Sequence, residues 1–165
     1  MNTLVVYESL WGNTRAIAEA IAEGIGEGAA AMSTADATLD KVASAELLVA
    51  GAPILGFNLP TPAMRSSIKT NPAHAAHPAD LTHPSMREWL DDLPKGSARF
   101  ASFETRIWWS PGSAAKKIAE AMAGQGFVQA GAPAKFLVTG TYGPLKDGEL
   151  ERARAWGAAL AAEIG

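Results

Sequence analysis

Apolar residues follow two alternating patterns along this chain. Short apolar runs separated by turn residues are typical of buried strands, whereas apolar residues repeating every three or four positions are typical of amphipathic helices. Strands that alternate with helices imply right-handed crossovers and a parallel sheet covered on both faces. The runs predict five strands, at residues 4–7, 29–33, 46–51, 98–104 and 135–139.

Several helix ends are also visible in the sequence. Residues 85–88 have capping-box spacing, and the pair Ser110-Pro111 predicts an N-cap followed by proline in the first helical turn. A last helix is expected from Asp147. Residues 58–84 contain five prolines, which excludes a long regular element there but allows a short helix at 64–68. The length of 165 residues suits one domain spanning 1–165.

The loop between the first strand and the first helix has the composition of a phosphate-binding loop. Backbone N–H groups at a helix start lack intrahelical partners, and the helix dipole favours an anion there. Glycine lets the backbone approach a ligand closely, and the hydroxyl and amide side chains add donors. A plain helix cap would need neither the glycine nor the preceding strand. The loop consists of Ser9, Leu10, Trp11, Gly12, Asn13 and Thr14.

This loop carries a resemblance to the flavodoxin family. Flavodoxins have the pattern Ser/Thr-x-Thr-Gly-x-Thr here, and three of its four defined positions match, while Trp11 replaces a hydroxyl residue. The resemblance implies a three-layer, doubly wound α/β fold with a five-stranded parallel sheet in the order 2-1-3-4-5. It also implies FMN as the cofactor, bound by this loop and by the loops after the third and fourth strands. Beyond the first loop, the residues so implied are Pro53, Ile54, Leu55, Gly56, Phe57, Thr105, Arg106, Trp108, Trp109 and Gly112.

The position of these loops supports the same site. Ligands of open α/β sheets bind beyond the carboxyl ends of the strands, where the strand order reverses. Large apolar and aromatic side chains in two of the loops suit a flat heterocycle. Three aromatic residues are candidates to stack on it, namely Phe57, Trp108 and Trp109, and the sequence leaves open which one does so. Core packing is an equal alternative for either tryptophan.

Three functions remain open. The first is a one-electron carrier similar to flavodoxin, working with redox partner proteins, in which the Gly56–Phe57 peptide would hydrogen-bond the reduced flavin. The second is an FMN-dependent NAD(P)H:quinone reductase; Arg106 would favour it if its charge stabilised the fully reduced, anionic flavin. The third is a flavin-free scaffold or regulator. The carrier is preferred because the chain has no dimer-building insertion, so a monomer or weak dimer is expected. No catalytic residue is assigned.

Composition excludes other classes. A net charge of −3 and the absence of any Lys/Arg cluster argue against nucleic acid as a partner. The chain has no cysteine and no apolar window of about 18 residues, so we expect a cytoplasmic protein that does not span a membrane. His74, His77 and His83 lie in the Pro/Ala-rich segment and are expected to be exposed to solvent rather than to bind a metal.

Overall fold

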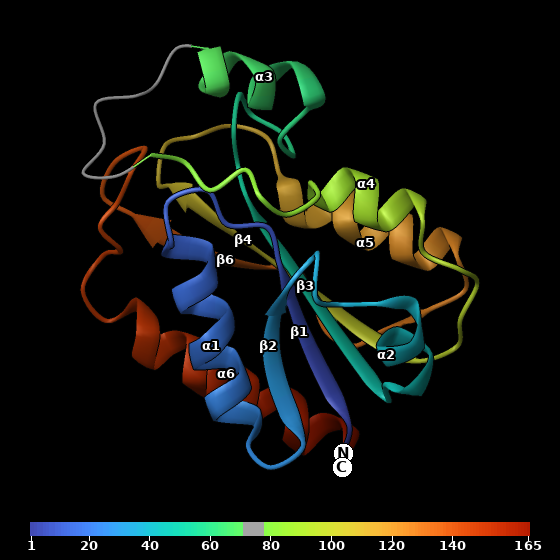
Figure 1. Cartoon of the computed structure of the whole chain (residues 1–165). Helices are drawn as coiled ribbons and strands as arrows, with labels where there is room; N and C mark the ends of the chain where they lie inside the picture. Colours follow the sequence, from blue (N-terminus) through green and yellow to red (C-terminus); the bar gives the residue numbers. More distant parts are fainter. Residues whose placement is uncertain (71–77) are drawn as a thin grey trace.

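Parallel strands form the centre of the protein. The computed structural model describes residues 1–70 and 78–165. Within these residues, six parallel strands make one sheet in the order β2-β1-β3-β4-β5, with β6 also paired to β4 (Figure 1). Their bounds are β1 Thr3–Tyr7, β2 Ala29–Ser33, β3 Leu47–Pro53, β4 Arg99–Ile107, β5 Val128–Gln129 and β6 Ala134–Val138.

All five predicted strands are present, in the predicted order. The additional strand, β5, has two residues and pairs with the start of β4, while β6 pairs with its second half. Both occupy the same edge of β4, so they share the fifth position of the predicted sheet. β4 extends three residues beyond its predicted end, which makes Thr105 and Arg106 strand residues instead of loop residues.

Helices cover both faces of the sheet (Figure 1). On one face lie α1 and α6, and on the other lie α2, α4 and α5. α3 lies beyond the carboxyl ends of the strands, and the two termini lie together at the opposite end. None of the helices in the described residues is both long and apolar enough for a bilayer span. Their bounds are α1 Asn13–Ile25, α2 Leu39–Ser44, α3 Pro62–Thr70, α4 Met86–Asp91, α5 Ala114–Gly124 and α6 Glu149–Ile164.

Two apolar cores follow from the alternation of side chains along the strands. Val5 and Val49 face α1 and α6, whereas their neighbours Val6 and Leu48 face α4 and α5. α1 and α6 approach closely because Gly157 packs against the backbone of Ile21; a Cβ on this glycine would lie 2.3 Å from the Ile21 carbonyl oxygen. This close packing fixes the direction of α1, whose first turn belongs to the loop predicted to bind phosphate.

Helix starts agree with the sequence at one predicted cap and differ at another. Ser85 caps α4 as predicted, since its Oγ accepts a hydrogen bond from the Glu88 N–H. The prediction that Ser110 caps the next helix is wrong, because α5 begins at Ala114 and Ser113 Oγ accepts from the Lys116 N–H. Ser113 also donates to the buried carboxylate of Glu104 at 2.6 Å, which holds the cap in place. The short helix predicted at 64–68 lies within α3.

Candidate functional site

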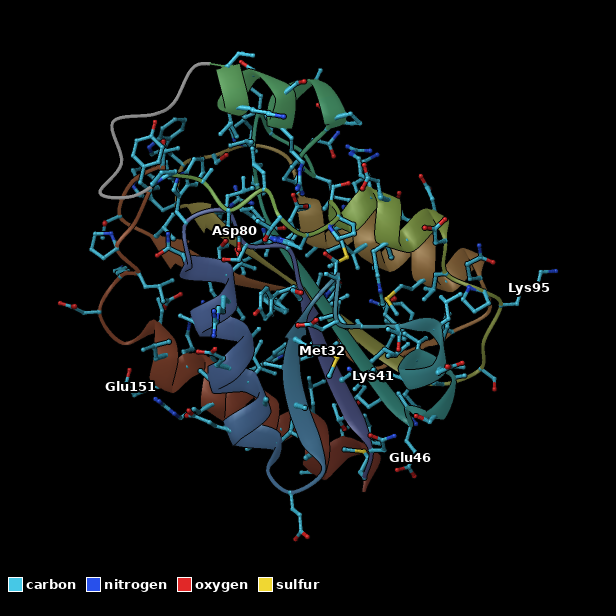
Figure 2. The ribbon with its side chains drawn as sticks, in the orientation of Figure 1. Met32, Lys41, Glu46, Asp80, Lys95 and Glu151 are labelled. Atoms are coloured by element: carbon cyan, nitrogen blue, oxygen red, sulfur yellow. The ribbon has the colours of Figure 1, made fainter. Side chains whose placement is uncertain are left out.

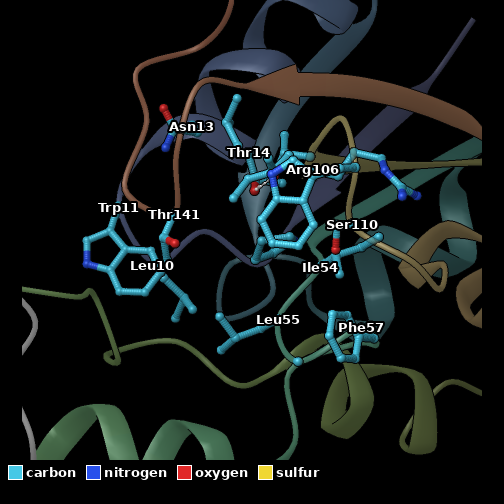
Figure 3. Close-up of a pocket in the computed structure, with 16 residues that line it drawn as sticks. Leu10, Trp11, Asn13, Thr14, Ile54, Leu55, Phe57, Arg106, Ser110 and Thr141 are labelled. Atoms are coloured by element: carbon cyan, nitrogen blue, oxygen red, sulfur yellow. Dashed lines mark hydrogen bonds between the residues drawn. The ribbon is translucent and has the colours of Figure 1, made fainter.

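A cavity of about 170 Å³ opens at the carboxyl ends of β1, β3 and β4 (Figure 3). β1 and β3 are neighbours in the sheet, and this is the place where the strand order reverses. Open α/β sheets bind ligands at such a position. The lining is mostly apolar, with a few polar groups from the strand ends. It consists of Leu10, Trp11, Asn13, Thr14, Pro53, Ile54, Leu55, Gly56, Phe57, Thr105, Arg106, Ile107, Trp109, Ser110, Val138 and Thr141.

The loop between β1 and α1 presents a row of free backbone donors. Within the described residues, the N–H groups of residues 10–14 have no protein acceptor, whereas those of Ser9, Arg15 and Ala16 are bonded. Gly12 caps α1 with a φ of 91°, and a Cβ there would meet no protein atom within 4 Å. The left-handed backbone, not protein crowding, is therefore what favours glycine at this position. Unpaired N–H groups at the start of a helix form an anion site.

Side chains connect this loop to the elements around it. Thr14 Oγ1 lies 2.8 Å from Thr105 Oγ1 of β4 and is buried. Asn13 Nδ2 donates to the Tyr142 carbonyl at 3.2 Å. The ring of Tyr142 meets Trp11 edge-on, with centroids 4.8 Å apart. The indole that departs from the flavodoxin pattern thus packs against the loop after β6.

The loop after β3 is a tight turn with an exposed aromatic residue. Leu55 and Asn58 exchange backbone hydrogen bonds of 2.9 and 3.2 Å, with two residues between them. Both intervening residues are left-handed, with φ of 54° for Gly56 and 69° for Phe57. This backbone is strained for phenylalanine, at a cost of roughly 1–2 kcal/mol. Phe57 is 58% exposed and lies at the cavity mouth.

The end of β4 and the loop after it contain a buried ion pair. Arg106 Nη1 lies 2.9 Å from Glu104 Oε2 and 3.1 Å from the Gly112 carbonyl oxygen. Glu104 is fully buried and also accepts from Ala115 N–H at 3.2 Å. Figure 3 shows the Arg106 side chain pointing away from Trp11. The charge of Arg106 is therefore neutralised inside the protein.

Twelve of the residues proposed from the sequence line the cavity together. Ser9 and Gly12 lie instead in the adjoining polar cavity, and Gly112 packs behind Phe57. Trp108 does not line the cavity and is 75% exposed, so of the three candidate aromatics Phe57 and Trp109 are the ones at its mouth. Sequence reasoning missed Val138 and Thr141. The sequence signal that could have found them is the turn after the last predicted strand, because this strand ends at the same edge of the sheet as the others.

The prediction for the histidines is wrong for His83. This residue is 5% exposed, and its Nε2 accepts the Ser9 N–H at 3.1 Å. Burial lowers the pKa of His83 below its ordinary value, and the nearby Arg65 acts in the same direction, whereas Asp80 opposes them. His74 and His77 lie outside the described residues. Among the described residues, no group of three His, Asp or Glu side chains could hold a metal ion.

A second buried carboxylate stands immediately before the phosphate-binding loop. Glu8 accepts from the Met86 N–H at 2.9 Å and pairs with Arg65 of α3 at 2.9 Å. Arg65 also donates to the His83 carbonyl at 2.6 Å. Burial raises the pKa of Glu8, while the Met86 N–H and Arg65 counteract that rise. Glu8 therefore connects the end of β1 to α3 and α4.

Comparison with known proteins decides the family. The flavodoxin family profile matches residues 5–156. The chain belongs to the flavodoxin family. Flavodoxins bind FMN and transfer electrons between redox partners, so FMN is the cofactor of this protein and electron transfer its function. Its free N–H groups and apolar cavity suit a phosphate joined to a flat ring.

Solved structures agree with this fold. A flavodoxin from the domain Archaea is 24% identical, with a TM-score of 0.70 over 99% of each chain. Flavodoxin 2 from Bacillus cereus is 14% identical, with a TM-score of 0.70 over 99% of each chain. A WrbA-like flavodoxin protein from Agrobacterium tumefaciens is 18% identical, with a TM-score of 0.65 over 99% of this chain and 96% of that one. A search of curated protein sequences found no match.

Proposed function

We propose that this flavodoxin is a one-electron carrier and that its FMN binds in the cavity at the carboxyl ends of β1, β3 and β4. The free N–H groups of residues 10–14 would hold the phosphate. Phe57 and Trp109, at the mouth of the cavity, would flank the ring. FMN supplies the redox chemistry, and the protein sets its potentials by the surroundings it provides.

The neutral lining of the cavity is the observation that favours a carrier. Among the described residues that line it, Arg106 is the only charged one, and it is already paired with Glu104. An uncharged, largely apolar site disfavours an increase in negative charge. The last electron should therefore enter FMN at a low potential, well separated from the first. Such separation favours transfer of electrons one at a time.

Stepwise reduction tests this proposal. The FMN-loaded protein is photoreduced without oxygen while its spectrum is recorded. We expect most of the protein to pass through singly reduced flavin, seen by its long-wavelength absorbance, before full reduction. Direct conversion to fully reduced flavin, together with rapid NAD(P)H oxidation in the presence of a quinone, would instead identify a reductase.

The reductase is the second candidate because of the open mouth of the cavity. Trp109 and Phe57 are 60% and 58% exposed, and a flat acceptor could stack beside them. The flavin-free alternative has less support, because the unpaired N–H groups at the start of α1 would then have no ligand.

We further propose a monomer or weak dimer, which sedimentation of the FMN-loaded protein would test.

A substitution of Thr14 tests the placement of the phosphate. Thr14→Ala removes a buried hydroxyl at the first turn of α1. Loss of one hydrogen bond to a charged acceptor should weaken FMN binding by roughly 1.5–3 kcal/mol, whereas Thr14→Ser should retain affinity. Titration of FMN fluorescence measures both dissociation constants. Equal affinities for the wild type and the alanine variant would show that the Thr14 hydroxyl does not hold the phosphate.

A further inference from the structure

Two residues shortly before α4, Asp80 and His83, contact the phosphate-binding loop at consecutive positions. The Asp80 N–H donates to the Leu10 carbonyl at 2.7 Å, and the Ser9 N–H donates to His83 Nε2 at 3.1 Å. Asp80 lies beside the start of α1 at the carboxyl end of the sheet (Figure 2). These contacts join positions 70 and 74 residues apart, and they use the Ser9 N–H and the Leu10 carbonyl. The free N–H groups begin at residue 10.

The hydrogen bond to Ser9 defines the protonation state of His83. Nε2 can accept only through its lone pair, so the imidazole is neutral and its proton is on Nδ1. Nδ1 faces Asp80 Oδ1 at 3.6 Å. Asp80 is itself held by hydrogen bonds from the N–H and hydroxyl of Thr82, at 2.9 and 2.6 Å. The carboxylate therefore favours the tautomer that leaves Nε2 free to accept.

Other elements support the same arrangement. Arg65 of α3 donates to the His83 carbonyl and pairs with Glu8 at the end of β1. On the far side, Ser9 Oγ accepts from the Arg15 N–H at 3.1 Å. Ser9 is buried, with 4% of its surface exposed, so its N–H would lack water as a substitute partner. His83 thus accepts the hydrogen bond of the buried Ser9 N–H, which directly precedes the free N–H groups of the loop.

We propose that His83 is a positioning residue of the phosphate-binding loop: as a neutral imidazole it takes up the Ser9 N–H and holds the loop so that the N–H groups of residues 10–14 converge on the FMN phosphate. This inference rests on the proposed placement of FMN. Without this acceptor, the Ser9 N–H would be left unpaired or would turn to another acceptor. The loop would then lose its alignment with α1. The effect is specific to the phosphate, because His83 does not line the cavity beside the aromatic residues.

Two variants of His83 test the proposal. His83→Leu fills a similar volume without an acceptor, and His83→Gln places an amide oxygen near the position of Nε2. Dissociation constants of FMN and of riboflavin, which lacks the phosphate, are measured by fluorescence for each protein. We expect His83→Leu to weaken FMN about tenfold, as loss of one buried hydrogen bond would, with riboflavin unchanged. His83→Gln should restore most of the FMN affinity.

The outcomes separate this inference from the proposed function. If the wild type binds FMN and His83→Leu binds it equally well, or loses FMN and riboflavin in the same proportion, His83 does not position the phosphate-binding loop. If Thr14→Ala leaves FMN binding unchanged while His83→Leu weakens it selectively, the Thr14 hydroxyl does not hold the phosphate, but the free N–H groups that His83 positions still do. A wild type that binds no FMN overturns both.

Nitrogen NMR of the wild type provides a test that needs no variant. The FMN-loaded protein at neutral pH should show His83 with an unprotonated Nε2 and a protonated Nδ1. The Ser9 amide proton should exchange slowly and show a coupling across the hydrogen bond to Nε2. A proton on Nε2, or rapid exchange of the Ser9 amide, would overturn the proposal.

Discussion

Two buried carboxylates at the strand ends are each paired with an arginine. Glu8 pairs with Arg65, and Glu104 pairs with Arg106. A buried charge without a partner is costly, and the pair also fixes the side chains to which it bonds. Only the second pair borders the proposed ring site. We therefore expect its balance of charge to influence the potential of FMN.

Removing the charge of Glu104 should raise that potential. Glu104→Gln keeps the shape of the side chain but leaves Arg106 with its full positive charge beside the cavity. A unit charge about 10 Å away, at an effective dielectric constant of about 20, is worth roughly 1.5 kcal/mol, or roughly 60 mV for one electron. We expect a rise of this size in the potential of the last electron, measured by anaerobic potentiometry.

The double variant Glu104→Gln/Arg106→Gln is the control. It removes both charges, so its potential should return toward that of the wild type. An unchanged potential in the single variant would show that the pair does not act on FMN.

Single residues were the scale at which the sequence was least informative. The motif from Ser9 to Thr14 indicated the phosphate-binding loop, since strand, glycine and helix start are all local signals. His83 gave no such signal, because its partner is 74 residues away and its neighbours suggest an exposed segment. Pairing of Arg106 with Glu104 likewise depends on the extension of β4, which the prediction ended too early.

At the scale of elements, the loops after β3 and β4 are in direct contact. A Cβ on Gly112 would lie 1.9 Å from the carbonyl oxygen of Phe57, so only a glycine allows the two backbones to meet. The Gly112 carbonyl in turn accepts from Arg106. The turn bearing Phe57 is thus supported by the loop that bears Trp109.

Gly112→Ala should separate these loops. Its Cβ would collide with backbone, and its φ of 84° is unfavourable for alanine, so we expect a loss of roughly 1–3 kcal/mol in the free energy of unfolding. FMN affinity should fall as well. Urea unfolding and flavin titration measure the two effects.

Gly124→Ala is the matched control for this substitution. Gly124 ends α5, and a Cβ there would meet no protein atom within 4 Å. Its stability should equal or exceed that of the wild type, because alanine favours the helix. If both variants behaved alike, the contact between the loops would have no energetic role.

Elements were predicted well wherever a periodic pattern was long enough. Short apolar runs predicted the five strands and apolar repeats predicted the main helices, whereas the strand order was predicted from the resemblance to flavodoxins. α2 and β5 were missed because they have six and two residues, too few for a repeat. The start of α5 was misplaced because Ser110-Pro111 is a good local cap, whereas the contact of Ser113 with Glu104 is tertiary.

At the scale of the whole molecule, stability should depend on pH through His83. Burial keeps this residue neutral and lowers its pKa in the folded state, with Arg65 adding to the effect and Asp80 opposing it. In the unfolded chain the pKa returns to about 6.5. As the pH falls below that value, the unfolded state therefore binds more protons and the free energy of unfolding decreases.

Comparison with His83→Gln isolates this contribution. Without FMN, the wild type should lose up to about 1 kcal/mol more stability than the variant between pH 7 and 5.5, measured by urea unfolding. Parallel pH profiles for the two proteins would contradict the prediction. Glu8 does not cause such a loss of stability, because its raised pKa in the folded state makes its contribution to the free energy of unfolding increase as the pH falls.

The division of the outer strand into β5 and β6 has a consequence for how the protein behaves in concentrated solution. Residues 130–133, with a left-handed Gly131 and with Pro133, interrupt the hydrogen-bonding edge beyond β4. A long, flat and unpaired edge invites another chain to add a strand, whereas a broken one does not. Shaped in this way, the edge should discourage one copy of this chain from adding a strand to another.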